Sequence, residues 1–246
     1  MTASKRSILI INPNSTASMT EGLKPLVDAL GFQDSITTTF FTAPSGPPSI
    51  NNEDDAATSV AHSIPSLQPL LAHHDAFLVA CYSPHPLVAA LKADPHVRAR
   101  RKPVTGIFEA SVAASLQLIS PDQAFGIVST GAVWEGVLGG AVTRFLGAEG
   151  SRRFAGTQTT GLTATELHNV EAGEVRRRMV RATRRLVGAG KVGAVCLGCA
   201  GMAGMNETVR EACVEELGKE EGERVWVVDG VQAGVAWLVG AMRMSA

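Results

Sequence analysis

Short apolar runs recur along the chain, and small or polar residues end each of them. Within the runs, Val, Ile, Leu and Ala follow one another almost without interruption instead of alternating with polar residues. This pattern is typical of strands that are buried on both faces of a parallel sheet. The six runs are SILIINPNS (7–15), DAFLVACYS (75–83), KPVTGIFEA (102–110), AFGIVSTGA (124–132), VGAVCLGCA (192–200) and RVWVVDGVQ (224–232).

Stretches with helical character lie between these runs. They are residues 56–72, 109–118, 166–186 and 207–217, with an alanine-rich helix expected from Leu87. Strands that alternate with helices predict a doubly wound α/β architecture. Ligands bind beyond the carboxyl ends of the strands in such folds, so the residues that end each run form the candidate site.

The strand ends repeat along the chain. Asn12 is followed 69 positions later by Cys81, and Ser129 is followed 70 positions later by Cys199. Each half thus has one strand that ends in polar residues and one that ends in cysteine. A chance alignment among many strands is the alternative explanation. The repeat favours two similar α/β lobes that face each other, with one cysteine from each.

The length of the chain agrees with two such lobes. A chain of 246 residues accommodates two lobes of roughly 100 to 120 residues. We expect the last strand, RVWVVDG, and the final helix to return to the first lobe. The first lobe is then residues 1–100 with about 206–246, and the second is residues 101–205.

The charge balance narrows the class of partner. The chain has 22 basic and 23 acidic residues, a net charge of -1, and therefore no strong field for nucleic acid or an anionic membrane. A small-molecule partner is expected instead. The N-terminus lacks the apolar region of a signal peptide, and charged residues interrupt every candidate membrane span. We expect a cytoplasmic protein whose four cysteines are reduced thiols.

Two of the cysteines, Cys196 and Cys199, form a C-x-x-C motif. A thioredoxin-type pair begins at a helix N-terminus, whereas Cys196 lies inside the apolar run AVCL and is expected in the core. A structural zinc site needs four ligands, and neither Cys81 nor Cys213 has a second cysteine or a suitable histidine nearby. Cys199 follows Gly198 at a strand end, where a substrate could approach it.

Cys81 has a similar environment, since it ends a strand shortly before an expected helix. The positive end of a helix dipole favours a thiolate, which can act as an acid or a base. A buried cysteine that acts as a small hydrophobe is the alternative for either residue. Two thiols on opposite faces of a substrate could invert a stereocentre by proton transfer without a cofactor, if backbone N–H groups stabilise the developing oxyanion.

Five segments carry a resemblance to a known family. They are INPNSTASMT (11–20), TAPSGPPSI (42–50), ACYSPHPL (80–87), PVTGIFEAS (103–111) and LGCAGMAGM (197–205). Together they resemble the hydantoin racemase branch of the aspartate/glutamate racemase superfamily, and in particular its fungal proteins linked to allantoin metabolism. The resemblance implies two pseudosymmetric Rossmann-like lobes, each a mainly parallel sheet flanked by helices, with the active site in the cleft between them.

The same resemblance implies the chemistry and the site. It predicts a homo-oligomeric, cofactor-independent racemase that inverts the ring α-carbon of a 5-substituted hydantoin or allantoin. Cys81 and Cys199 match the two catalytic cysteines, and Asn14 matches a polar substrate contact. Ser83, Thr130, Ala200 and Gly201 match positions that bind the carbonyl and amide groups of the ring. A non-catalytic protein that binds a ureide or an amino acid on the same fold is the alternative.

Some segments depart from the family pattern or are expected to have structural roles. Family members commonly continue the first cysteine motif with Asp-Pro-Gly, whereas this chain has Ser83-Pro84-His85-Pro86, which bears on the substrate more than on the chemistry. Residues 42–55 and 152–160 are expected to be connections that cover the site. The arginines of residues 176–185 predict a solvated or inter-subunit helix face. No histidine pair has metal-ligand spacing, so no metal is expected.

Overall fold

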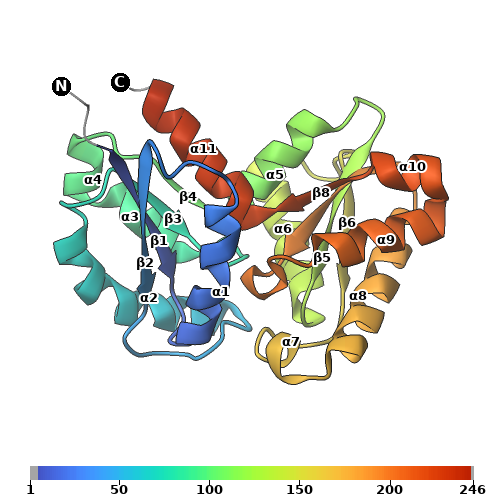
Figure 1. The fold of residues 1–246 in the computed structure, drawn as a ribbon, viewed down its shortest axis with the longest axis horizontal. Coiled ribbons are helices and arrows are strands. Elements are labelled where there is room, and N and C mark those ends of the chain that lie inside the picture. The colour runs from blue at the N-terminus through green and yellow to red at the C-terminus, as the bar shows by residue number, and fades with distance from the viewer. Residues whose placement is uncertain (1–4, 245–246) are drawn as a thin grey trace. The chain divides into compact units, whose positions relative to one another are not determined.

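The computed structural model describes residues 5–244 and divides into two compact units (Figure 1). The first unit is Met1–Ile107 with Val231–Ala246, and the second unit is Phe108–Gly230. Helices flank a parallel four-stranded sheet in each unit. This arrangement confirms the predicted α/β class with two lobes.

The sheet of the first unit has the order β2-β1-β3-β4, and all of its strand pairs are parallel. Its central strands coincide with the predicted apolar runs, and the side chains of β3 are completely buried. The strands are β1 (Arg6–Asn12), β2 (Ile36–Thr42), β3 (Ala76–Val79) and β4 (Val104–Gly106).

The helices of the first unit include the last helix of the chain. A Cβ atom on Gly234 of this helix would lie 2.5 Å from Cδ1 of Leu78, so the helix backbone packs directly on β3. The Arg6 guanidinium also donates to the Met242 carbonyl. The helices are α1 (Ala17–Asp28), α2 (Glu53–Leu67), η1 (Gln68–Leu70), α3 (Pro86–Ala93), α4 (Pro95–Ala99) and α11 (Gly230–Met244).

The sheet of the second unit repeats the first topology, with the order β6-β5-β7-β8 and only parallel pairs. Strands β5 and β7 correspond to β1 and β3, so the repeat of strand ends seen in the sequence is a repeat of the fold. The strands are β5 (Ala124–Ser129), β6 (Phe154–Thr159), β7 (Val192–Gly198) and β8 (Trp226–Asp229).

Helices α6, α8 and α9 of the second unit pack on this sheet. The apolar stripe Val175, Met179, Ala182 and Leu186 of α8 is buried, as its spacing predicts. The helices are α5 (Ile107–Leu118), α6 (Val133–Leu146), α7 (Glu166–Asn169), α8 (Ala172–Val187), η2 (Ala200–Met202), α9 (Asn206–Leu217) and α10 (Lys219–Arg224).

The expected return of the last strand to the first lobe is wrong. Strand β8 pairs with β7, with Cys196 opposite Val228, and residues 206–230 therefore belong to the second unit. The physical reason is that β8 completes the hydrogen bonding of the open edge of β7. The domain boundaries at 100 and 205 thus move to 107 and 230.

Three further elements differ from the sequence-based expectation. Residues 36–42 and 154–159 form the edge strands β2 and β6, although the latter was expected to be a covering connection. The helix expected over 166–186 is divided between α7 and α8. The side chain of Glu171 accepts hydrogen bonds from the Gly173 and Glu174 N–H groups, and this new N-cap begins α8.

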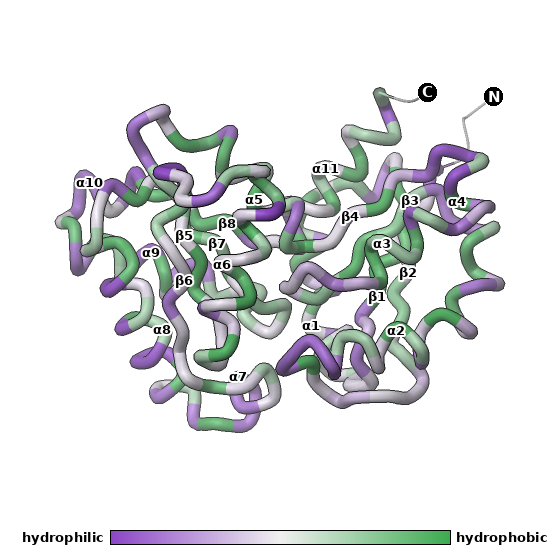
Figure 2. The backbone as a smooth tube through the Cα atoms, turned by 180° about the vertical axis from the view of Figure 1, so that it is seen from behind, coloured by the Kyte–Doolittle hydropathy of each residue, from purple (hydrophilic) through white to green (hydrophobic). Residues whose placement is uncertain are grey.

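Hydropathy follows this arrangement. Figure 2 shows hydrophobic residues concentrated along the strands, whereas the outer helices α8 and α10 carry hydrophilic segments. Among residues 5–244, no helix has the length and apolar character needed to cross a bilayer.

Glycine at position 198 is required by close packing at the end of β7. A Cβ atom there would lie 2.7 Å from both the Val128 carbonyl oxygen and Cγ2 of Ile127. Gly198→Ala should lower the free energy of unfolding by about 1–3 kcal/mol, because the backbone oxygen cannot move aside. Chemical denaturation measures this loss. The control Gly136→Ala, in open space on α6, should be neutral or stabilising; equal effects of both substitutions would contradict the prediction.

Candidate active site

Cys81 lies just beyond the carboxyl end of β3, where two tight turns shape the chain. The Ser83 N–H donates to the Cys81 carbonyl (3.1 Å), and the His85 N–H donates to the Ser83 carbonyl (2.7 Å). The half-buried Cys81 thiol lies 3.5 Å from the hydroxyl oxygen of the buried Ser83. A thiol and a hydroxyl group therefore share this strand end.

Asn14 organises the loop between β1 and α1. Its Oδ1 atom accepts hydrogen bonds from Nδ2 of Asn12 (3.0 Å) and from the Thr16 N–H (2.9 Å). Its own amide group donates to the Met19 sulfur at 3.3 Å, which is a weak acceptor. The side-chain carbonyl of Asn14 thus holds the loop together. The N–H groups of its side-chain amide are the part that a ligand could bind.

The connection after β2 is attached to this loop. Ser15 binds it twice, with its N–H to the Pro47 carbonyl (3.1 Å) and its hydroxyl to the Gly46 carbonyl (3.1 Å). The Thr16 hydroxyl donates to the Pro48 carbonyl (2.7 Å). Residues 43–50 therefore lie beside the Asn14 loop at the carboxyl end of the first sheet.

Cys199 ends β7 and begins η2 in the second unit. Its half-buried sulfur accepts a hydrogen bond from the Gly201 N–H (3.3 Å). Burial raises the pKa of the Cys199 thiol to about 11, although the N–H groups of Gly201 and Met202 act in the opposite direction. At neutral pH this side chain is therefore a protonated thiol.

Thr130 lies beside Cys199 because of the register between β5 and β7. Ser129 is paired with Gly198, and its hydroxyl donates to the Gly198 carbonyl (2.7 Å). The residues that follow these strands, Thr130 and Cys199, therefore lie near each other at the carboxyl end of the sheet. The Thr130 carbonyl accepts from the Gly161 N–H (3.0 Å), which attaches the turn after β6 to the same place.

The structure thus brings the predicted site residues together in two groups, one in each unit. Asn14, Cys81 and Ser83 lie at the carboxyl end of the first sheet. Thr130 and the Cys199–Gly201 turn lie at the equivalent end of the second. Each unit therefore presents a thiol beside a polar loop at the position that the doubly wound architecture reserves for ligands.

The remaining cysteines belong to the core. Cys196 is completely buried on β7, and its sulfur lies 3.1 Å from the Ser115 hydroxyl oxygen. Cys213 is completely buried on α9. Within residues 5–244, histidine, cysteine, aspartate and glutamate side chains form no group of three or more that could hold a metal ion.

His168 on α7 is a candidate site residue that the sequence analysis missed. A Cβ atom on Gly201 would lie 3.1 Å from its Nε2 atom and 3.5 Å from the Cys199 sulfur. The imidazole and the thiol therefore both lie close to the same point beside Gly201. No sequence pattern joins these residues, because contact depends on how α7 packs against η2; the glycines of LGCAGM indicate only that something approaches closely.

Comparison with known proteins identifies the family. A model of the family Asp/Glu/Hydantoin racemase matches residues 8–238. The chain belongs to this family. A hydantoin racemase of Pseudomonas sp. is 30% identical over 93% of this chain and 82% of its own length. An uncharacterized protein of Schizosaccharomyces pombe is 34% identical over 97% of this chain and 92% of its own length.

Solved structures show the same fold. An allantoin racemase from Klebsiella pneumoniae matches with a TM-score of 0.78 and 24% identity, and covers 98% of this chain and 89% of that one. The resemblance found in the sequence is thereby confirmed, and membership of the Asp/Glu/Hydantoin racemase family supports an isomerase of the racemase type.

The loop that follows Cys81 contains a buried histidine, His85, with a structural role. His85 accepts the Leu87 N–H at its Nδ1 atom (3.2 Å) and so caps α3. Its Nε2 atom therefore carries the proton and donates to the Ser59 hydroxyl (3.1 Å), which donates in turn to the Ala56 carbonyl (2.8 Å). Burial lowers the pKa of His85 to about 4, so the ring is neutral.

Acid should therefore destabilise the protein through His85. The unfolded histidine binds a proton below its ordinary pKa of 6.5, whereas the folded one does so only below about 4. Stability is thus lost as pH falls from 6.5 to 4, by up to about 3 kcal/mol. His85→Asn keeps a capping group that does not titrate and should reduce the slope of unfolding free energy against pH.

Urea denaturation at several pH values measures this slope. His74, whose pKa burial also lowers, should continue to contribute in both proteins. An unchanged slope in His85→Asn would contradict the assignment.

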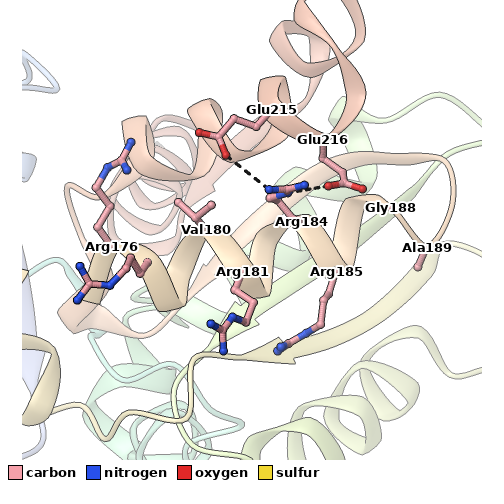
Figure 3. A pocket seen from close by; sticks show the side chains of 10 residues that line it. Arg176, Val180, Arg181, Arg184, Arg185, Gly188, Ala189, Glu215 and Glu216 are labelled. Atoms are coloured by element: carbon pink, nitrogen blue, oxygen red, sulfur yellow. Dashed lines mark hydrogen bonds and ion pairs between the residues drawn. The ribbon is translucent and has the colours of Figure 1, made fainter. Parts of the chain in front are cut away.

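The arginine-rich face of α8 forms a separate feature of the second unit. Figure 3 shows the arginines that line a hollow of about 720 Å³, with Arg184 directed toward Glu215 and Glu216 of α9. Arg176 pairs with Glu211, and Arg177 and Arg178 pair with Glu174. These exposed ion pairs contribute little individually, and they are typical of a solvated helix face.

Arg181 differs from its neighbours. Arginines occupy all four positions three and four residues away from it on the helix, namely 177, 178, 184 and 185. Among residues 5–244 it has no acidic partner within ion-pair distance. Like charges at these spacings destabilise a helix by about 0.2–0.5 kcal/mol per pair.

Arg181→Glu should consequently stabilise the protein by about 1 kcal/mol, because four repulsive pairs become attractive. Urea denaturation at low salt measures the gain in unfolding free energy, because urea is uncharged and does not screen the charges. The gain should shrink as salt is added. Arg176→Glu is the matched control, since no arginine occupies its corresponding positions and it loses its partner Glu211. Destabilisation by Arg181→Glu would show that this guanidinium has a favourable contact.

Proposed function

We propose that the protein is a cofactor-independent racemase that inverts the ring α-carbon of a 5-substituted hydantoin or of allantoin. The observation that carries the proposal is the repeat of one thiol at the same strand end in two sheets of identical topology, Cys81 after β3 and Cys199 after β7. The 30% identity to a hydantoin racemase and the fold shared with allantoin racemases support this substrate class.

The proposed reaction uses one thiol as the base and the other as the acid. In one direction, the Cys81 thiolate removes the proton from the ring α-carbon, and the carbanion is stabilised as an enolate. The Cys199 thiol donates its proton to the opposite face of the same carbon. Burial, which keeps Cys199 protonated, suits it to this role. After turnover Cys81 is a thiol and Cys199 is a thiolate, ready for the reverse direction.

The polar groups of the strand ends bind the ring in this proposal. The Asn14 side-chain amide and the Ser83 hydroxyl of the first unit bind polar groups of the ring. The Thr130 hydroxyl and the Ala200 backbone N–H of the second unit do the same. The Gly201 N–H already donates to the Cys199 sulfur, and it therefore stabilises the thiolate that forms when this thiol gives up its proton.

The alternative is a protein that binds a ureide or an amino acid without turnover. Burial of Cys199 favours this alternative, because it raises the pKa of the thiol to about 11 and little thiolate is then present at pH 7 to act as the base. Proton exchange distinguishes the two functions, since binding alone leaves the α-carbon proton in place.

The test uses candidate hydantoins and allantoin in deuterated water. The wild type should replace the α-carbon proton by deuterium, seen by NMR, and should abolish optical rotation. Cys81→Ser and Cys199→Ser should each reduce racemisation by about two to four orders of magnitude. Cys213→Ala removes a buried core cysteine and should retain activity. If the wild type and both serine variants exchange the α-carbon proton only at the background rate, the proposal is contradicted. Tight binding of a ligand without proton exchange would support the alternative.

A further inference from the structure

His168 and Cys199 both lie close to Gly201. One Cβ atom at this position would be in contact with Nε2 of His168 (3.1 Å) and with the Cys199 sulfur (3.5 Å). It would also lie 3.3 Å from Cδ1 of Leu167. The imidazole and the thiol thus both lie within contact distance of the same point beside Gly201, all within the second unit.

The position of His168 is fixed although α7 is only one turn long. Leu167 and Met202 are buried in the same core cluster, and Cys199 packs against this cluster. Thr163 and Glu166 bind each other reciprocally at the start of the turn: Glu166 accepts from the Thr163 N–H (2.8 Å) and donates its own N–H to the Thr163 hydroxyl (3.2 Å). The imidazole itself is exposed to solvent.

The two proton sites therefore differ in their access to water. Cys199 is half-buried, whereas His168 is exposed to solvent and lies close to the same point beside Gly201 as the thiol does. Histidine is the side-chain type that exchanges protons readily near neutral pH. A relay is needed because each turnover of the proposed reaction leaves Cys199 in the opposite protonation state, and the next turnover in the same direction requires that state to be reset.

We propose that His168 is a positioning residue that carries protons between the Cys199 thiol and solvent. This inference rests on the proposed function. In the step itself, the S–H bond of Cys199 breaks and its proton passes to the Nε2 lone pair of the neutral imidazole, directly or through one water molecule. The thiolate keeps the electron pair, and the imidazolium then releases a proton to solvent. The reverse sequence restores the thiol.

Other charged groups of the neighbouring elements are engaged elsewhere. Glu166 of α7 is bound to Thr163, Arg178 of α8 is paired with Glu174, and Arg210 of α9 faces Glu207 at 3.9 Å. Cys213 of α9 is buried, and burial raises its pKa to about 11. Among these groups, His168 is the one that lies close to the same point beside Gly201 as the Cys199 sulfur does.

The first test measures the thiol and not the racemase activity. Iodoacetamide alkylation of Cys199, followed by mass spectrometry of its peptide, gives a rate at each pH. His168→Gln should lower the rate at pH 7–8 by about tenfold or more and move the profile to higher pH, because a general base is lost. The rate at Cys81 in the same samples is the internal control and should not change.

A second pair of variants separates proton transfer from a structural effect. His168→Ala should show the same loss, and added imidazole should restore Cys199 alkylation toward the wild-type rate. Asn169→Ala changes the exposed neighbour on the same turn and should behave as the wild type with and without imidazole. Gly201→Ala would place a methyl group beside His168 and Cys199 and should lower the rate while His168 remains in place.

The outcomes distinguish this inference from the proposed function. If racemisation occurs but His168→Gln leaves both the pH profile of Cys199 alkylation and that of kcat unchanged, the relay is wrong and the two-cysteine racemase stands. If the alkylation of Cys199 depends on His168 while no hydantoin or allantoin exchanges its proton, the contact is supported and the proposed substrate class fails. Absence of rescue by imidazole would overturn the relay.

Discussion

The pairing of the two central strands in each sheet determines where the two candidate thiols, Cys81 and Cys199, lie. Ile11 is opposite Val79 in the first sheet, and Ser129 is opposite Gly198 in the second. Beyond these pairs the strands end, and their backbone groups must find partners in loops and side chains. Gly198 allows the closest approach, because any side chain there would meet the carbonyl of the neighbouring strand. A shift of register would therefore separate the thiols from their polar loops.

The chemistry of the second strand end depends on a balance of opposing effects on Cys199. Burial favours the neutral thiol, whereas the N–H groups of the following turn favour the thiolate. A substrate that brings its own polar groups to this place would alter that balance. Because burial keeps the proton on Cys199, the relay proposed through the exposed His168 would serve to exchange this proton with solvent.

The sequence predicted the parts of the fold that are buried and failed for those that are not. All six apolar runs contain strands, but the edge strands ITTTFFT and FAGTQT were overlooked because alternating exposure makes them rich in Thr and Gly. The assignment of β8 failed because an apolar run does not specify which sheet it joins. Cys81 and Cys199 could be found from their strand ends, whereas His168 could not, since its contact is set by tertiary packing alone.

Burial also explains why residues of one type have different roles in this chain. Cys196 and Cys199 are three positions apart, yet the first is fully enclosed by β7 and α5 while the second lies in the turn beyond the strand. His85 and His168 form a similar contrast. Burial keeps the His85 ring neutral, and its Nδ1 atom caps a helix, whereas His168 is exposed to solvent. The chemistry of a cysteine or histidine in this chain therefore depends more on how deeply its side chain is buried than on its spacing from another residue of the same type.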